Sequence, residues 1–190
     1  ALDGIGPTQP RTQDEDVGNG EHQATRFTKH VDVTAPPMAD AAITTLPRLQ
    51  VERVALGDTA GATQWSRGRW LILLNADEAP TRQRFSLAHE LKHVIDNPFV
   101  DLLYPAIRGM SSDERRERIC DHFAACLLMP RAWVKRAYCV EGVQDVRRLA
   151  SRFGVSPAAM RYRLNLIGLA EPAVRCALAA DSWYVIRTTP

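Results

Sequence analysis

Cysteines are few in this 190-residue chain, and none of them forms the short Cys-x-x-Cys pair typical of metal knuckles and redox motifs. Their spacing also provides no dense disulfide framework. We therefore expect reduced thiols and a cytoplasmic location. The four cysteines are Cys120, Cys126, Cys139 and Cys176.

Long apolar runs are lacking as well. No stretch approaches the roughly 20 apolar residues needed to cross a bilayer, and the N-terminal residues lack the basic and apolar regions of a secretory signal. We therefore expect no membrane partner. The net charge of +2 is also small, so by itself it favours no polyanionic partner.

Apolar residues are scarce in residues 1–37, where glycines and prolines interrupt a polar run whose only aromatic residue is Phe27. Such a segment buries too little apolar area to offset its ordering entropy. We predict a weakly ordered extension, with a short strand near residues 27–33. A folded domain is expected over residues 38–140.

The most informative stretch is His89-Glu90-Leu91-Lys92-His93. Residues four apart lie side by side on one face of a helix, so the two imidazoles could bind a single ion. Glu90 projects about 100° away around the helix axis and could instead accept a proton from an attacking water. This is the spacing of zinc peptidases, although an isolated match also occurs on solvated helices.

The residues around this motif predict a real helix. Thr81 could serve as its N-cap, and Asn97-Pro98 ends it, because a residue before proline avoids the α region. An apolar stripe at helical spacing would bury one face. Its members are Phe85, Ala88, Leu91, Val94 and Ile95.

A second helix is predicted to begin after Ser111, which has the capping-box spacing to Glu114. On this helix, Glu117 could complete a set of two histidines and one glutamate. Asp121 follows one turn later and could accept the N–H of a ligating histidine. The alternative is that both acids only pair with neighbouring arginines on a solvated face.

Two neighbours of these acids are further possible ligands. Cys120 more often packs as a small hydrophobic residue among small neighbours. His122 projects about 100° away from Asp121 and is expected to flank the site.

The segment between residues 46 and 75 predicts strands. An apolar series ends at the turn signal Gly57-Asp58, and two further runs flank the glycine-containing loop 66–69, which indicates a hairpin. The continuous apolar run 70–74 is typical of a strand buried on both faces. The predicted fold class is α+β, with a small sheet packed on the helix of His89 and the helix of Glu117 crossing behind it.

Taken together, these segments resemble the ImmA/IrrE family of zincin-like metallopeptidases. The resemblance implies one Zn²⁺ per chain, held by His89, His93 and Glu117, with Glu90 as the general base and Asp121 supporting a histidine. Two positions differ from the usual family pattern, which has glycine in place of Lys92 and asparagine in place of Asp121. The segments that carry the resemblance are residues 70–75, 84–93, 117–130 and 149–169.

Residues 141–170 read as a helix-turn-helix-like segment, with helices over 143–153 and 157–167 and Ser156 as N-cap. One interpretation is DNA binding. The basic residues for it are Arg147, Arg148, Arg152, Arg161 and Arg163, and the recognition positions are Ala158, Ala159, Arg161 and Tyr162. We favour a helix pair that completes the peptidase core, because two alanines offer little base readout. Residues 171–190 form a tail with a short predicted strand at 182–187.

The resemblance implies a regulatory peptidase whose protein substrate is a helix-turn-helix transcriptional repressor. Candidates for stabilising the oxyanion are Tyr104, Tyr138 and His122. The alternative is a DNA-binding or protein-interaction regulator with a structural or vestigial zinc site. Glu90 argues against that alternative, because a structural site needs ligands but no base.

Overall fold

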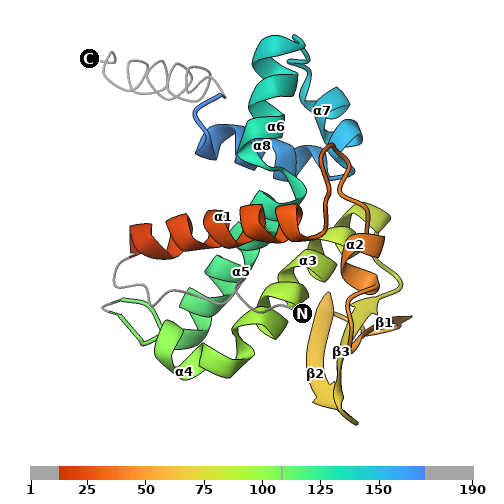
Figure 1. Ribbon diagram of the computed structural model, residues 1–190, viewed down its shortest axis with the longest axis vertical. Helices are drawn as coiled ribbons and strands as arrows, with labels where there is room; N and C mark the ends of the chain where they lie inside the picture. Colours follow the sequence, from red (N-terminus) through yellow and green to blue (C-terminus); the bar gives the residue numbers. More distant parts are fainter. Residues whose placement is uncertain (1–12, 108, 170–190) are drawn as a thin grey trace, which may run out of the picture.

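The computed structural model describes residues 13–107 and 109–169. It is an α+β fold, with a small sheet at one end and helices packed against it (Figure 1). The strand predicted at 182–187 lies outside the described residues. The elements are α1 Gln13–His30, α2 Ala41–Thr44, β1 Leu49–Val54, β2 Gly61–Ser66, β3 Arg69–Asn75, α3 Pro80–Asp96, η1 Asn97–Phe99, α4 Val100–Leu103, α5 Ser112–Leu128, α6 Arg131–Lys135, η2 Arg136–Val140, α7 Val146–Phe153 and α8 Pro157–Leu166.

The sheet has β3 at its centre, in the order β1-β3-β2. The predicted hairpin joins β2 and β3 in antiparallel pairing, while β1 runs parallel to β3. Within the described residues β2 pairs only with β3, so its outer edge is unpaired. Ile72 and Leu74 are fully buried, whereas Leu71 and Leu73 are only partly covered. The prediction that β3 is buried on both faces is therefore confirmed only for the face that carries Ile72 and Leu74.

Helices α3 and α5 pack against each other beside the sheet. α3 begins two residues earlier than predicted, because its N-cap is Ala79 and not Thr81. Pro80 lies in the first turn, where the missing N–H has no intrahelical partner in any case. α5 begins with the predicted capping box, in which Ser111 and Glu114 exchange hydrogen bonds. Helix starts were therefore largely encoded in local sequence.

Helix α1 corrects the expectation for the N-terminal segment. Residues 13–30 form this 18-residue helix, so the predictions of weak order and of a strand near residues 27–33 are wrong for them. Phe27 and Ala24 are almost completely buried, and α1 packs along α5. Gln23 is buried too and accepts a hydrogen bond of 2.6 Å from Lys92 Nζ of α3. A few well-placed contacts thus order a segment of polar composition.

The two helices α7 and α8 share one hydrophobic core with the sheet, α3 and α5. α7 starts at Val146 rather than 143, because the Asp145 side chain caps it at the Arg148 N–H. Gly154 ends it with a left-handed φ of +65°, a conformation that favours glycine. Ser156 caps α8 as predicted. Two helices joined by a turn are present, and DNA recognition by them stays the less favoured interpretation.

Arg163 differs from the expectation of a solvated or DNA-binding arginine. Its side chain is 1% exposed. Its Nε donates to the Met129 carbonyl at 3.0 Å and its Nη2 to Glu21 at 2.9 Å. Arg163 therefore ties α8 to the end of α5 and to α1, and it is not available to a nucleic acid.

We predict that Arg163→Met lowers the free energy of unfolding by about 2–3 kcal/mol, because it leaves a buried carbonyl and Glu21 without their partner. The exposed Arg161→Met is the matched control and should stay within about 0.5 kcal/mol of the parent. Urea unfolding followed by circular dichroism measures both. Equal stabilities for the two variants would contradict this role.

Candidate metal centre

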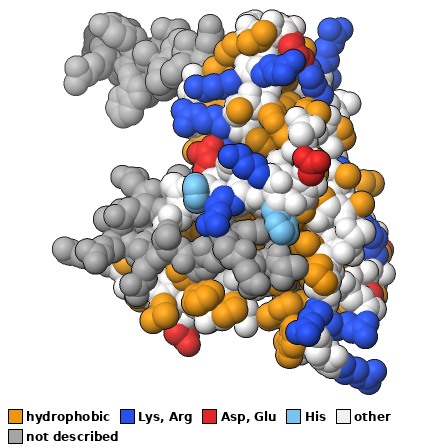
Figure 2. Space-filling view, viewed as in Figure 1, with side chains coloured by type: hydrophobic (Ala, Val, Ile, Leu, Met, Phe, Trp, Pro, Cys, Tyr) orange, Lys and Arg blue, Asp and Glu red, His pale blue; other side chains and the backbone are white. Residues whose placement is uncertain are grey.

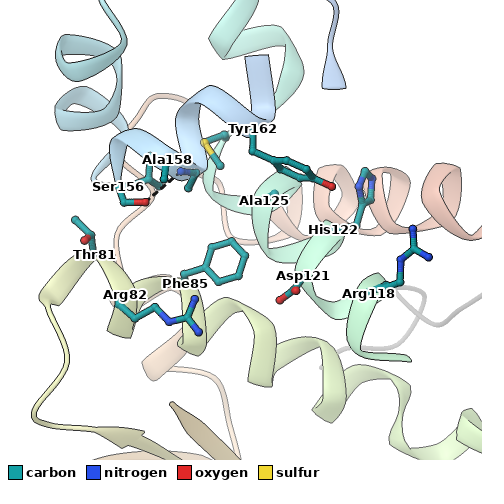
Figure 3. Close-up of a pocket in the computed structure, with 13 residues that line it drawn as sticks. Thr81, Arg82, Phe85, Arg118, Asp121, His122, Ala125, Ser156, Ala158 and Tyr162 are labelled. Carbon is teal, nitrogen blue, oxygen red and sulfur yellow. Dashed lines mark hydrogen bonds between the residues drawn. The ribbon is translucent and has the colours of Figure 1, made fainter. Parts of the chain in front are cut away.

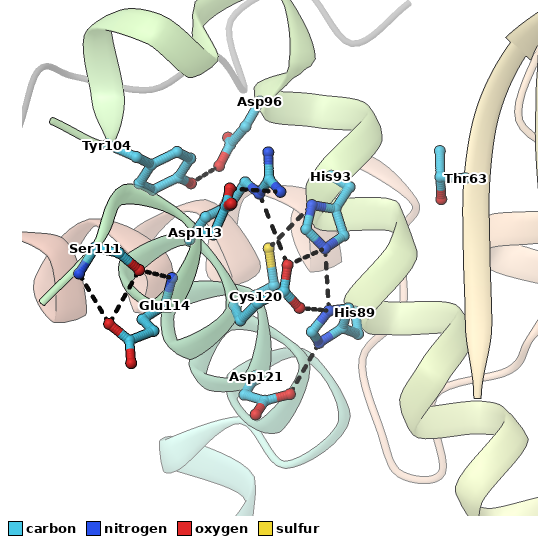
Figure 4. A network of polar contacts seen from close by, with 12 residues as sticks. Thr63, His89, His93, Asp96, Tyr104, Ser111, Asp113, Glu114, Cys120 and Asp121 are labelled. Atoms are coloured by element: carbon cyan, nitrogen blue, oxygen red, sulfur yellow. Dashed lines mark hydrogen bonds and ion pairs between the residues drawn. The ribbon is translucent and has the colours of Figure 1, made fainter. Parts of the chain in front are cut away.

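Three side chains from two helices converge beside the sheet. α3 presents His89 and His93 one turn apart (Figure 4). α5 brings Glu117 within contact distance of both. His89 Nε2 lies 3.1 Å from His93 Nε2 and 3.1 Å from Glu117 Oε2, and His93 Nε2 lies 3.5 Å from Glu117 Oε1. Ligands of a tetrahedral ion at ~2.0–2.1 Å are separated by roughly 3.3 Å. These donors therefore fit a divalent ion such as Zn²⁺.

Asp121 lies on the far side of the His89 ring. Its Oδ1 is 2.9 Å from His89 Nδ1, a distance at which the carboxylate can accept the N–H of that nitrogen. The lone pair of His89 Nε2 is then directed toward His93 and Glu117. The sequence prediction that Asp121 contacts a histidine one helix away matches this geometry.

Cys120 is an alternative to Glu117 as the third ligand. The ligand atoms of His89, His93 and Cys120 all lie within 4.8 Å of one another. The sulfur, however, lies 3.7 Å from His93 Nδ1, on the other side of the ring from the converging Nε2 atoms. Cys120 is also fully buried, whereas Glu117 lies at the open side of the site. Glu117 is the better third donor.

Glu90 stands beside these donors without belonging to them. It is only 8% exposed, and its Oε2 accepts a hydrogen bond of 2.5 Å from the hydroxyl of Thr63 on β2. Gly61 leaves space for it, because a Cβ at that position would come within 3.0 Å of Glu90 Oε1. Sequence analysis missed Thr63 and Gly61, since their role depends on how β2 docks against α3.

The charges of the site follow from burial and neighbours. Burial and the nearby His89 lower the pKa of His93 to about 4, which keeps its imidazole neutral. Burial alone would also lower the pKa of His89, but Asp121, Glu90 and Glu117 outweigh it and raise that pKa. Burial raises the pKa of Glu90, against the opposing effects of Thr63 and His89. A carboxylate of raised pKa is a stronger proton acceptor.

Lys92, one of the two departures from the family pattern, does not enter the site. It is 2% exposed and pairs with Asp96 one turn later, and its ammonium lies 5.7 Å from the Phe123 ring centroid. Tyr104 is also buried and donates its hydroxyl to Asp96. Tyr104 is therefore held in this network, away from the converging nitrogens, and the structure does not support it as the oxyanion group.

A groove runs past the converging donors. One cavity of about 370 Å³ lies on the β2 side, where Thr63, Glu90 and His93 are among its lining residues. A second cavity of about 290 Å³ shares Glu90 and Glu117 with it and continues to Asp121. Glu90 and Glu117 thus line both cavities, while His93 lines the first and His89 the second.

The small sheet, the two helices and the convergent donors form an arrangement of the kind found in metallopeptidases. Residues 47–165 match the model of the IrrE N-terminal-like domain, a peptidase family. The chain therefore belongs to this family, and the resemblance to ImmA/IrrE proteins is confirmed.

Two curated relatives carry the same description, radiation response metalloprotease IrrE. The one from Deinococcus radiodurans is 32% identical over 100 residues, which are 50% of this chain and 30% of the relative. The one from Deinococcus deserti is 32% identical over 99 residues, which are 50% of this chain and 35% of that relative. The matched region thus spans about a third of each relative.

A solved structure described as a Mycobacterium tuberculosis transcriptional regulator has a similar fold. Its TM-score is 0.61 at 20% identity, over 82% of this chain and 52% of that one. This likeness concerns the fold alone.

Within the described residues, no helix combines the length and apolar character needed to cross a membrane.

We predict that the purified protein binds one Zn²⁺ per chain. His89→Ala and Glu117→Ala should lose it, because each removes a converging donor. Cys120→Ser should retain it, and Asp121→Ala should weaken it about 10- to 100-fold. Metal analysis after dialysis against a graded chelator measures all four. Loss of zinc in Cys120→Ser but not in Glu117→Ala would overturn the choice of third donor.

Proposed function

We propose that this chain is a zinc-dependent metallopeptidase that cleaves a specific protein. The observation that carries the proposal is the position of Glu90. Its carboxylate is buried beside the converging donors, held by Thr63, and lines the groove on both sides of the site. A purely structural ion needs ligands but has no use for such a base.

The proposed reaction is general-base hydrolysis of a peptide bond. Zn²⁺ held by His89, His93 and Glu117 would polarise the scissile carbonyl and acidify the attacking water. Glu90 accepts the proton of that water as it attacks, and then delivers it to the leaving amine. Thr63 restricts the carboxylate to one orientation through its hydrogen bond.

The outer edge of β2, which pairs with no other strand in the described part of the chain, supplies a place for an extended substrate. β2 contacts α3, and its residues Gly61 and Thr63 line the groove at Glu90. An extended peptide could add to this edge by main-chain hydrogen bonds, which would lay its backbone across the site. The strand order leaves both β1 and β2 as edge strands, and of these two it is β2 whose residues line the groove.

The proposed substrate is a helix-turn-helix transcriptional repressor inside the cytoplasm. Membership of the IrrE N-terminal-like family supports this choice, since the resemblance to ImmA/IrrE proteins implies cleavage of such repressors. The curated relatives are described as radiation response metalloproteases, which is consistent with a regulatory role.

A DNA-binding function is the second candidate. It is favoured by exposed basic side chains, which gather over the end of the molecule formed by α6, α7 and α8 (Figure 2). They include Arg131, Lys135, Arg147, Arg148 and Arg161. Two others are engaged, because Arg163 is buried and Arg152 pairs with Glu141. We therefore favour the peptidase.

We expect the zinc-loaded protein to cleave the repressor encoded nearest to its own gene, and Glu90→Gln to bind zinc while losing at least about a hundredfold in rate. Mass spectrometry of the products over time measures both. An intact repressor would reject this substrate. Equal rates for Glu90→Gln and the parent would reject the mechanism.

A further inference from the structure

A cavity of about 420 Å³ lies where α8 meets α3 and α5 (Figure 3). Phe85, Met129 and Val155 provide much of its apolar lining, and the small side chains of Ala158 and Ala159 leave it open. This volume lies in the range of ligand sites rather than packing defects.

The cavity continues the groove of the candidate metal centre. It shares Arg82, Phe85 and Asp121 with the adjoining cavity that contains His89 and Glu90. Asp121 connects the two directly, because it lines the cavity and also contacts His89 Nδ1 at 2.9 Å. A chain lying across the metal centre would therefore pass the mouth of this cavity.

The face of α8 that would read DNA in a helix-turn-helix protein is turned into this cavity. Ala158, Ala159 and Tyr162, three of the four recognition positions, all line it. In Figure 3 the Tyr162 ring extends from α8 over the space above Phe85 and Asp121. Tyr162 is 59% exposed, so its ring is accessible to a group that enters the cavity.

We infer that this cavity, the α8 cavity, is a substrate subsite that takes an apolar side chain of leucine, methionine or phenylalanine size from the cleaved protein. The inference rests on the proposed function. It assigns α8 to the peptidase reaction as a specificity element, with Tyr162 covering the bound side chain. The alanines set the size of residue that fits.

Charged side chains at the rim of the α8 cavity indicate which residues should flank the apolar side chain of the substrate. Arg82 and Arg118 line the α8 cavity and are exposed at its edge. Arg82 pairs with Glu78 at 3.7 Å, and the Arg118 guanidinium contacts the Met110 sulfur at 3.9 Å. Both guanidinium groups can therefore turn to a carboxylate. The favoured segment is an apolar residue flanked by acidic ones.

Binding can be tested without turnover. The full-length Glu90→Gln protein, labelled with ¹⁵N, is titrated with acetyl-Asp-Leu-Asp-amide and, in parallel, with acetyl-Asp-Gly-Asp-amide. We expect the leucine peptide to shift the amide signals of Ala158, Ala159 and Tyr162, and to bind about tenfold more tightly than the glycine peptide, because only leucine buries apolar area.

Two variants complete the test. Ala158→Trp places a large ring at an exposed position of the cavity wall and should abolish the leucine preference. Ser151→Trp makes a matched change at an exposed position of α7 and should leave it intact. Equal binding of the two peptides, shifts that map elsewhere, or a leucine preference that survives Ala158→Trp would overturn the subsite.

Titration with a 20-base-pair DNA duplex tests whether α8 binds DNA instead of a substrate side chain. If the duplex shifts the same α8 signals and the leucine peptide does not, α8 reads DNA and the inference is wrong. Failure of the proposed function has a different signature. In that case the leucine preference persists in the α8 cavity, while no Glu90-dependent cleavage of the repressor is found.

Discussion

The contact between α3 and α5 is the interaction on which the rest of the structure depends. Apolar residues of both helices, such as Leu91 and Phe123, are completely buried in one core. This packing fixes the distance at which His89 meets Glu117 and Asp121, which lie 28 and 32 residues further along the chain. Donor separations near 3 Å between two helices require rigid supports. A shift of one helix along the other would separate the donors.

The surrounding elements hold this helix pair in place. α1 packs along α5 on one side, and the sheet covers α3 on another. Arg163 ties α8 to the carbonyl end of α5 and to α1. The helices that resemble a DNA-binding module are thus built into the same core as the metal centre. This arrangement explains why α8 can shape the groove beside the site.

Local sequence predicted what depends on local physics. The spacing of His89 and His93, the capping box at Ser111 and the N-cap at Ser156 each act within a few residues, and the structure shows the helices that they imply. The proximity of Glu117 and Asp121 to His89 followed from the family resemblance, and the geometry agrees with it.

Long-range packing produced the features that sequence analysis missed. The composition of residues 1–37 concealed α1, because a few buried residues such as Phe27 are enough to dock it. Arg163 looked like one more surface arginine until the fold placed Glu21, 142 residues away in sequence, beside it. The bond from Thr63 to Glu90 likewise exists only once β2 lies against α3. No periodicity or motif carries such information.

The central claim is that two imidazoles and one carboxylate hold the metal. X-ray absorption spectroscopy of the zinc-loaded protein tests it most directly, since it measures the ligand atoms themselves. The account predicts nitrogen and oxygen ligands at ~2.0–2.2 Å and no sulfur. A zinc–sulfur distance of ~2.3 Å would instead place Cys120 on the metal and contradict the assignment of Glu117.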